Sequence, residues 1–362
     1  MRILICGGGV IGASIAYYLS QRGAKAIVIE RAGLACAASG KSGGFLALDW
    51  CDGTPLESLA RQSFTLHAEL AQQLDGSRWG YRRMTTYSGS RSKNGNHYGY
   101  ALDWVSNNVI LDRRLGTVET TAQVHPGQFT AAMMEAAQSR GSELRIGEVQ
   151  DMPREGDGNV ATVIVDGETI EGDAVVVAMG PWSERAAQWL PIPPVAGHKG
   201  HSLVFDTDIN TPADALFLEM QEGSGATLSP EVIPRPDGTT WVCAVSSDRP
   251  LPLDPLDIDL DVGAYETLLA LSRKLSPMLA EARVVAKQAC FRPVTADGLP
   301  LIGRVAGSRG AYIATGHSVW GILNAPATGQ AMADLILDGC TKALDLRAFD
   351  PGRFDSHYHA AL

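Results

Sequence analysis

The chain has 362 residues and a formal net charge of −10, with 45% hydrophobic and 19% charged residues. Such a chain is too long for one simple core, so two domains are expected, and its composition excludes a disordered or fibrous protein and is typical of an ordinary soluble enzyme. No run of Lys and Arg exceeds two residues, which argues against nucleic acid as the main partner because phosphate binding needs a basic surface.

The cysteines, the histidines and the N-terminus narrow the class further. No apolar run approaches the ~20 residues that cross a bilayer, so no membrane span is expected. A predicted strand begins almost at once, which leaves no room for a signal peptide and predicts a cytoplasmic protein; a targeting segment removed from the N-terminus is the alternative that stays open.

The histidines in 197–201 (GHKGH) lack carboxylate or cysteine companions, so no metal is expected. Scattered spacing favours reduced thiols over a disulfide framework or a zinc site for Cys6, Cys36, Cys51, Cys243, Cys290 and Cys340.

The first elements form a strand–helix–strand unit. Residues 2–6 are a short apolar run, 10–23 have helical spacing and stop at a glycine, and 25–31 read as a second buried strand. The two strands are expected to be parallel and joined by a right-handed crossover. Residues 56–74 predict an amphipathic helix, and the Gly- and Ser-rich stretch 88–99 predicts an exposed loop.

The remaining elements alternate between the two expected domains. A helix over 125–141 leads into short strands, and 166–180 predicts a hairpin followed by a buried strand. Short alternating runs in 195–250 predict a separate antiparallel sheet. Residues 250–261 form a linker to a helix at about 262–280, and the chain closes with a strand within 310–316 and a helix over 324–339.

This order predicts an α/β fold with an α+β substrate part. The Rossmann-like nucleotide-binding domain is expected to combine the discontinuous segments 1–80, 121–190 and 288–362. The inserted, mostly antiparallel β substrate domain is expected to combine 81–120 and 191–287.

A glycine fingerprint follows the first strand and opens the first helix. In Gly7-x-Gly9-x-x-Gly12, the first glycine allows the tight turn, the second lets backbone approach a pyrophosphate, and the third lets helix and sheet pack closely. Glu30 closes the second strand, where a carboxylate accepts from a ribose hydroxyl and repels a 2′-phosphate. The context predicts a dinucleotide other than NADP and leaves NAD and FAD open.

Four longer motifs decide between these two. They are GGGVIGASIAYYLSQRG (7–23), DAVVVAMGPWS (173–183), FRPVTADGLPLIGR (291–304) and ATGHSVWGILNAPATG (314–329). Together they resemble the D-amino-acid oxidase superfamily of FAD-dependent amine and amino-acid oxidoreductases, and its glycine oxidase branch most closely. The resemblance spans the whole chain and is most specific in the last part, and it implies FAD as the cofactor.

The resemblance also implies a set of cofactor contacts. The loop 39–45 would lie along the isoalloxazine and pyrophosphate, with a flexible surface loop as the alternative, and Val149 would present backbone to the adenine unless it is an ordinary strand residue. A helix expected to begin with Asn324 as N-cap and Pro326 in its first turn would aim N–H groups at the flavin pyrimidine edge. His317 would donate to the flavin or be a packed histidine. The full expected set is Gly7, Gly9, Val10, Ile11, Gly12, Glu30, Arg31, Ser39, Lys41, Ser42, Gly43, Gly44, Val149, Ala178, Gly180, Trp182, Cys290, Gly316, His317, Gly321, Ile322 and Leu323.

Cys290 raises the question of a covalent flavin. In the related monomeric sarcosine oxidases, a cysteine seven residues before an aspartate forms a thioether to the flavin, and Cys290 and Asp297 have this spacing. The residues after Cys290 instead resemble glycine oxidase, whose branch binds FAD without a covalent bond, and buried free cysteines are common as small hydrophobes. Non-covalent FAD is favoured, and a thioether at Cys290 is the alternative.

Three residues are expected to handle the substrate. Arg292 occupies the position of the carboxylate-binding arginine of glycine oxidase, and a guanidinium holds a carboxylate bidentately; a surface or Asp-paired arginine is the alternative. Glu231 replaces an expected tyrosine, and Ser318-Val319-Trp320 departs from the glycine oxidase pattern. These departures make glycine doubtful and favour a bulkier substrate or one with a positive charge near Glu231. Trp320 is either an aromatic wall or plain packing.

The predicted function is FAD-dependent oxidation of a primary or secondary amine, and of an amino acid in particular. A hydride passes to the flavin and water hydrolyses the resulting imine, with oxygen or another electron acceptor closing the cycle. The partners are thus small molecules. The alternatives are a sarcosine-like N-methyl amino acid oxidase or dehydrogenase, a non-catalytic flavoprotein assembly factor and, third, an NAD-dependent dehydrogenase. Substrate identity, stereochemistry and oligomeric state are not predicted.

Overall fold

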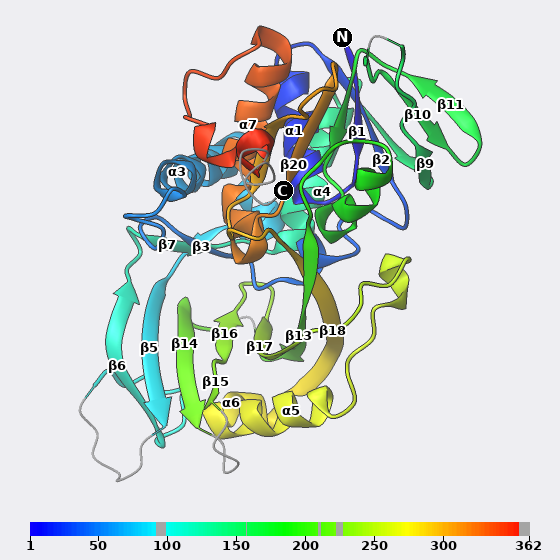
Figure 1. Cartoon of the computed structure of the whole chain (residues 1–362). Helices are drawn as coiled ribbons and strands as arrows, with labels where there is room; N and C mark the ends of the chain where they lie inside the picture. The colour runs from blue at the N-terminus through cyan, green and yellow to red at the C-terminus, as the bar shows by residue number, and fades with distance from the viewer. Residues whose placement is uncertain (92–98, 157, 209–210, 222–226, 355–362) are drawn as a thin grey trace.

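The computed structural model describes residues 1–91, 99–156, 158–208, 211–221 and 227–354. Two halves meet at the middle of the molecule (Figure 1). One half contains a mostly parallel sheet with helices, and the other contains a large, mostly antiparallel sheet with two helices on its outer face. Among the described strands of that second sheet, only β14 (Asp214–Gln221) and β5 (Thr85–Arg91) pair in parallel.

The parallel sheet has six strands in the order β19-β20-β12-β1-β2-β8. All neighbours are parallel except β19 and β20. Parallel strands need crossover connections, which cover the faces of the sheet, so the strands are near-continuous apolar runs such as the fully buried AVVV of β12. The strands are β1 (Arg2–Cys6), β2 (Lys25–Glu30), β8 (Glu143–Ile146), β12 (Ala174–Val177), β19 (Leu301–Arg304) and β20 (Ala311–Thr315).

Two layers cover this sheet. One face packs against helices that share a single hydrophobic core with it: α1 (Val10–Gln21), α3 (Glu57–Gln73), α4 (Pro126–Gln138) and α7 (Gly321–Asp338). The other face packs against η2 (Gly180–Gln188) and a three-stranded antiparallel sheet of β9 (Val149–Asp151), β10 (Thr162–Val165) and β11 (Glu168–Glu171).

The second half is built on an eight-stranded sheet in the order β18-β13-β17-β16-β14-β5-β6, with β15 paired to β14. Helices α5 (Ala264–Leu275) and α6 (Pro277–Glu281) cover its outer face, whereas the inner face looks toward the parallel sheet (Figure 1). Its strands are β5 (Thr85–Arg91), β6 (Val109–Gly116), β13 (Ala196–Asp206), β14 (Asp214–Gln221), β15 (Thr227–Leu228), β16 (Glu231–Pro234), β17 (Thr239–Ser247) and β18 (Arg283–Val294).

Short elements join the halves. A small sheet pairs β3 (Phe45–Ala47) and β4 (Arg82–Arg83) with the two sides of β7 (Thr121–Gln123). The remaining short helices are α2 (Ala38–Lys41), η1 (Gly76–Trp79), η3 (Pro255–Asp257), η4 (Ser318–Trp320), η5 (Arg347–Phe349) and η6 (Pro351–Phe354).

The predicted fold class is confirmed: parallel and antiparallel sheets coexist in an α/β protein with a Rossmann-like half and an antiparallel half. The first strand–helix–strand unit, the helices over 56–74 and 125–141, and the hairpin and strand within 166–180 all form. The predicted boundary between 287 and 288 falls inside β18, whose residues pair with β13 along their whole length. The exact division into domains stays a prediction.

Two local predictions were wrong. Residues 88–91 are not a loop but the end of β5, which lies between β6 and β14; residues 92–98 lie outside the described part of the chain. The helix expected over 262–280 is broken, because Ser276 has extended backbone between α5 and α6 and the Ser276 Oγ instead caps α6. Pro277 at the first position of α6 has no N–H to continue α5.

Helix α7 also begins earlier than predicted, at Gly321 rather than after Asn324. Asn324 is fully buried, and its side-chain amide has no hydrogen-bond partner among the described residues, so it does not act as a cap. Pro326 lies inside the helix instead of in the first turn, and has no N–H to give to the carbonyl four residues earlier.

A buried histidine compensates for this proline. The His67 Nε2 atom lies 2.9 Å from the carbonyl oxygen of Ile322 and 3.2 Å from that of Leu323. Burial lowers the pKa of His67 to about 4, so its ring is neutral at pH 7 and the Nε2–H donates. The side chain of α3 therefore completes the first turn of α7.

Within the residues that the structure describes, none of the helices combines the length and the apolar character that spanning a bilayer takes.

Candidate functional site

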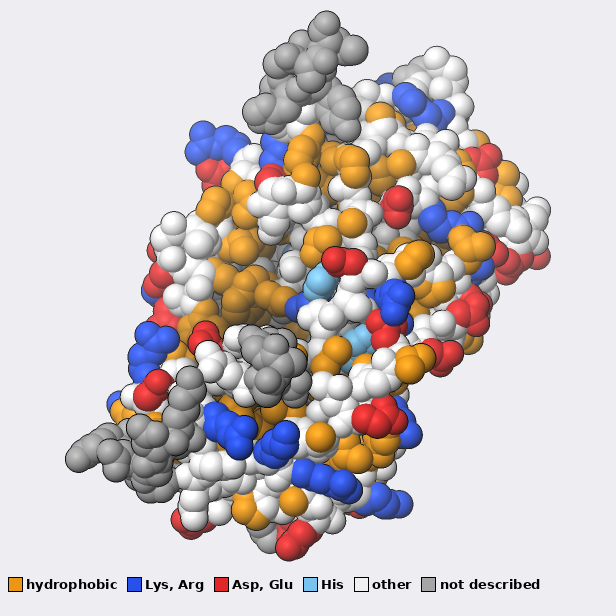
Figure 2. Space-filling model, turned by 60° about the horizontal axis from the view of Figure 1, so that its bottom comes forward, with side chains coloured by type: hydrophobic (Ala, Val, Ile, Leu, Met, Phe, Trp, Pro, Cys, Tyr) orange, Lys and Arg blue, Asp and Glu red, His pale blue; other side chains and the backbone are white. Residues whose placement is uncertain are grey.

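A cavity of about 710 Å³ lies between the two halves. Its walls come from the β1–α1 turn, the segment after β2, the start of η2, the inner face of the antiparallel sheet and the start of α7. This volume is within the range of small-molecule and cofactor sites. Figure 2 shows hydrophobic side chains gathered around a hollow near the middle of one face.

The glycine turn at the start of α1 has no room for side chains. A Cβ atom on Gly7 would lie 2.2 Å from the carbonyl oxygen of Ala178, and Gly7 has a φ of +118°. A Cβ atom on Gly12 would lie 2.0 Å from the Gly7 oxygen. Gly7 and Gly9 line the cavity with Val10, whereas Gly12 lies outside it and allows α1 to pack closely on β1. The cradle fits a bound pyrophosphate, which the α1 N-terminus would attract.

Glu30 lies at the end of β2, on the cavity wall. Its two carboxylate oxygens accept from the amides of Gly8, at 2.6 Å, and Ala32, at 3.1 Å, which fixes the side chain. Arg31 forms a 3.2 Å ion pair with Glu148, immediately before Val149. This end of the cavity thus presents a preoriented carboxylate where a ribose was predicted.

The loop 39–45 is held in place by the antiparallel half. Trp241 Nε1 donates to the Lys41 carbonyl at 3.0 Å, and Arg235 Nη2 donates to the Ser42 carbonyl at 3.0 Å. The Ser39 Oγ accepts from the Val10 amide at 2.9 Å, at the first turn of α1. These bonds tie the loop to both halves and place it against the cavity, so it is not a free surface loop.

The start of α7 faces the cavity from the opposite wall. Gly321 and Ile322 line the cavity, whereas Leu323 and Gly316 lie behind its surface. The first-turn amides of α7 give this wall the partial positive charge of a helix N-terminus.

His317 is buried at the edge of this wall. Its Nε2 atom lies 3.1 Å from Thr328 Oγ1, and burial lowers its pKa to about 3, so the ring is neutral. The Nδ1 atom has no partner among the described residues, and the side chain also lines the cavity.

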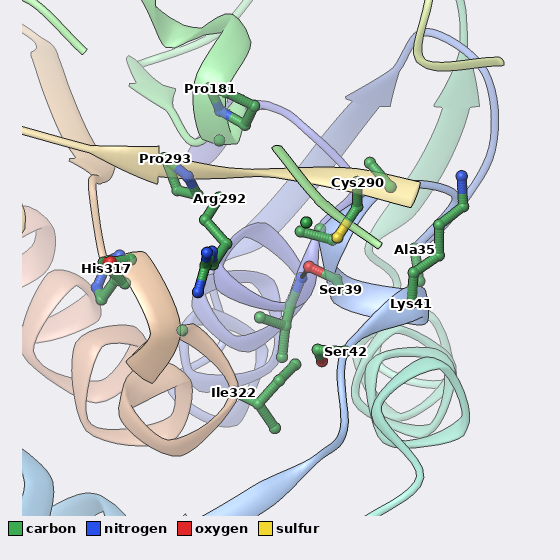
Figure 3. Close-up of a pocket in the computed structure, with 18 of the residues that line it drawn as sticks. Ala35, Ser39, Lys41, Ser42, Pro181, Cys290, Arg292, Pro293, His317 and Ile322 are labelled. Atoms are coloured by element: carbon green, nitrogen blue, oxygen red, sulfur yellow. Dashed lines mark hydrogen bonds between the residues drawn. The ribbon is translucent and has the colours of Figure 1, made fainter. Parts of the chain in front are cut away.

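Strand β18 supplies two cavity residues from one face. Cys290 and Arg292 are two positions apart, so both side chains point into the cavity (Figure 3). Burial raises the pKa of the Cys290 thiol, which is free. Lys41, also on the wall, donates to the Ala289 carbonyl at 3.2 Å. None of the residues drawn in Figure 3 is hydrogen-bonded to the Arg292 guanidinium, so this group is available to a ligand.

Glu231 enters the cavity from β16. Burial raises the pKa of its carboxyl, and the charge of Arg292 partly opposes this shift. Trp320 is part of an aromatic wall beside it: its ring lies 6.3 Å from that of Trp50, which lies 4.9 Å from Phe217. Trp320 thus lines the cavity rather than only filling the core.

Every other predicted contact lies on the cavity wall: Ile11, Lys41, Ser42, Gly43, Gly44, Val149, Ala178, Gly180 and Trp182. Whether they contact FAD stays a prediction. Sequence reasoning missed the aromatic residues Trp50 and Phe217. Trp50 follows the predicted cofactor loop closely, and this position of an aromatic residue was the only local signal in the sequence that it lines the cavity. Phe217 gave none.

The two histidines of the 197–201 segment each lie near a carboxylate that the sequence did not indicate. His198 Nδ1 lies 3.1 Å from Asp248, and His201 Nε2 lies 3.5 Å from Asp261. In the described parts of the chain, no group of three or more His, Cys, Asp or Glu residues could hold a metal ion.

The fold and the cavity define a dinucleotide-binding α/β protein with a second, antiparallel half over its ligand site. The family model of FAD dependent oxidoreductases, DAO, matches residues 2–335, so the chain belongs to this family and FAD is its cofactor. The glycine cradle, the fixed Glu30 carboxylate and the α7 N-terminus fit this cofactor.

Individual relatives agree with this assignment. A protein of Schizosaccharomyces pombe assigned as an oxidoreductase is 31% identical over 378 residues, covering 96% of this chain and 97% of the relative. Glycine oxidase of Geobacillus kaustophilus is 28% identical over 378 residues, covering 96% of this chain and 95% of the relative. The crystal structure of glycine oxidase from Geobacillus kaustophilus superposes with a TM-score of 0.81 at 25% identity, over 97% of this chain and 99% of that one.

Proposed function

We propose that this protein oxidises a primary or secondary amine, and specifically an amino acid, to an imine that water then hydrolyses. The observation that carries the proposal is the Arg292 guanidinium, which projects into the cavity that the start of α7 also lines. Similarity to glycine oxidase supports the same chemistry. FAD supplies the hydride acceptor when it is bound.

The residues of this chain orient the substrate. Arg292 holds the carboxylate through two parallel N–H···O bonds, which fix both the position and the angle of the amino acid. Hydrophobic and aromatic walls exclude water from the amine carbon, and the α7 N-terminal amides favour negative charge on the cofactor side of the cavity. No side-chain base is required when the amine binds neutral.

The experiment follows flavin bleaching under anaerobic conditions in the purified holoprotein. Glycine, sarcosine and the D and L forms of larger amino acids are added one at a time, and at least one is expected to bleach the visible flavin band. Reoxidation in air with release of hydrogen peroxide would identify oxygen as the acceptor. A panel in which no amine bleaches the flavin would contradict the proposal and favour a non-catalytic flavoprotein.

The role of Arg292 is tested with Arg292→Met. Loss of a charge-assisted bidentate bond of about 2–3 kcal/mol corresponds to a rise of ~30- to 150-fold in the half-saturating amino acid concentration. The matched control is Arg145→Met, which removes a surface arginine paired with Glu168. Unchanged saturation in Arg292→Met would exclude Arg292 as the carboxylate anchor, even if amine oxidation itself is observed.

A further inference from the structure

A half-buried carboxyl group and an aromatic wall lie together on the inner face of the eight-stranded sheet. Glu231 of β16 is directly opposite Phe217 of β14 on one side and Cys243 of β17 on the other. Directly opposed residues of neighbouring strands project their side chains from the same face, and all three line the cavity.

The aromatic rings next to Glu231 form a continuous surface. Phe45 lies 4.8 Å from Phe217 and 4.9 Å from Trp50, measured between ring centroids. Trp320 extends this surface toward α7. The edges and faces of aromatic rings differ in charge, and a ring face attracts a cation, most strongly where water is excluded. A carboxylate beside such a wall is therefore complementary to an organic cation.

Arg292 does not neutralise this carboxylate directly. Between β18 and β16 lie β13 and β17, so three strand spacings of ~4.8 Å separate the two backbones. The charge of Arg292 lowers the pKa of Glu231 in part, and both residues line the same cavity from two strands of one sheet. The Lys41 amine, the other cationic side chain near Cys290, is bonded to the Ala289 carbonyl.

We propose that Glu231 and the aromatic wall of Phe45, Trp50, Phe217 and Trp320 bind a second, cationic group of the substrate, whose carboxylate is held by Arg292. The substrate class is then an amino acid with a basic side chain, an alkylammonium or guanidinium group separated from the carboxylate by an extended aliphatic linker. This inference rests on the proposed function, since it assumes that Arg292 anchors a carboxylate.

Arg292 at one end of the substrate and Glu231 at the other each select for one charged group. A neutral side chain of the same length would bring no charge to the Glu231 carboxylate, which would keep only the hydrogen bond with Cys243 while losing water. A shorter amino acid such as glycine would reach Arg292 but not Glu231. The replacement of an expected tyrosine by Glu231 thus changes which end of a substrate the cavity recognises.

The test measures binding without turnover. The flavin of the holoprotein is first reduced chemically under anaerobic conditions, so that bound amino acids are not consumed, and dissociation constants are measured by calorimetry. Two matched pairs serve as probes in both stereochemical forms: lysine against norleucine, and arginine against citrulline. The wild-type protein is expected to bind at least one charged member ~10-fold or more tightly than its neutral match.

Three variants separate the contributions of the carboxylate and of the aromatic wall to the preference for a charged probe. Glu231→Gln keeps the shape of the side chain and is expected to abolish the preference for the charged probe while leaving norleucine binding within about twofold, which also reports correct folding. Phe217→Leu is expected to reduce the preference ~2- to 5-fold. Glu219→Gln, on β14 but exposed, is the matched control and should change nothing.

The outcomes distinguish this inference from the proposed function. Equal binding of charged and neutral probes to the wild type, or a preference that survives in Glu231→Gln, would overturn the cation site while leaving carboxylate binding by Arg292 intact. Binding of neither member of any pair would also overturn the cation site, whereas the proposed function would fall only if no amine of the anaerobic panel bleached the flavin.

Discussion

Replacing His67 by phenylalanine removes one N–H donor from the core and keeps an aromatic ring in place. The His67 ring is fully buried and its centroid lies 4.7 Å from that of Phe129, so a phenyl group retains this contact. The substitution leaves the Ile322 carbonyl without a donor, because Pro326 cannot supply the usual helical N–H. The Leu323 carbonyl loses a second, longer contact.

The expected loss of stability follows from these two carbonyls. A buried acceptor without a partner costs about 1–3 kcal/mol, and one N–H serves both oxygens, so the free energy of unfolding at pH 7.5 should fall by about 2 kcal/mol. In a chain of this length such a change corresponds to about 3 °C in Tm. Because Ile322 lines the cavity, FAD affinity should fall as well.

The pH dependence gives a second, independent signature. The pKa of His67 falls from 6.5 to about 4 on folding. A lowered histidine pKa means that the unfolded chain binds more protons between these values, so this residue costs stability as pH falls from 6.5 toward 4, by about 1.4 kcal/mol per pH unit. The phenylalanine variant lacks this term, and the wild-type advantage of about 2 kcal/mol should vanish near pH 5.

The assay is urea unfolding of both proteins with saturating FAD, followed by far-UV circular dichroism at several pH values. Matched slopes of the transitions would show that the same surface is exposed in each variant. Equal stability of the two proteins at pH 7.5, or a difference that is the same at pH 5 as at pH 7.5, would refute the assignment of His67 as a neutral donor to α7.

Three further predictions concern the cofactor site. Gly12→Ala should destabilise the fold by about 1–3 kcal/mol and lower flavin content on purification, because its Cβ atom would lie 2.0 Å from the Gly7 oxygen, whereas Gly156→Ala meets no atom within 4 Å and should be neutral. Acid precipitation of the wild type should leave all flavin in the supernatant, as in Cys290→Ser; yellow colour in the wild-type pellet alone would establish a thioether instead. Trp241→Phe removes the donor to the Lys41 carbonyl, and fluorescence titration of the apoprotein should show ~5-fold weaker FAD binding; an unchanged affinity would mean that the loop is held without this bond.

The parts of the site that a single continuous segment forms could be predicted from the sequence. The glycine turn and Glu30 belong to a single strand–helix–strand unit, in which spacing alone fixes the relation between the residues. Cys290 and Arg292 lie on one strand face for the same reason, since strand side chains alternate. Resemblance to a family added the expectation that these segments meet at one cofactor, and the structure places them around one cavity.

Parts of the site that depend on distant segments were not predictable in this way. Asn324 followed by Pro326 is a sound local signal for a helix start, yet a donor far away in sequence, His67, allows α7 to begin earlier. The aromatic wall likewise joins Trp50 to Phe217, which belong to different halves of the molecule. Such contacts leave no periodicity in the sequence, because tertiary packing rather than local propensity creates them.

The strands of the parallel sheet come from distant parts of the chain, and this affects how the protein folds during its synthesis on the ribosome. In the sheet, β12 lies between β1 and β20, and β20 (Ala311–Thr315) is synthesised late. Helix α7 (Gly321–Asp338) follows it and completes the helical layer that buries α1. At a synthesis rate of ~5–20 residues per second, the apolar β1–α1 unit waits ~15–60 s for these neighbours. During that interval its glycine cradle has no far wall, so the nascent chain gains its nucleotide site only after residues 321–338 have left the exit tunnel. Cofactor loading therefore follows the synthesis of α7, and a chaperone that shields β1 would be needed until then.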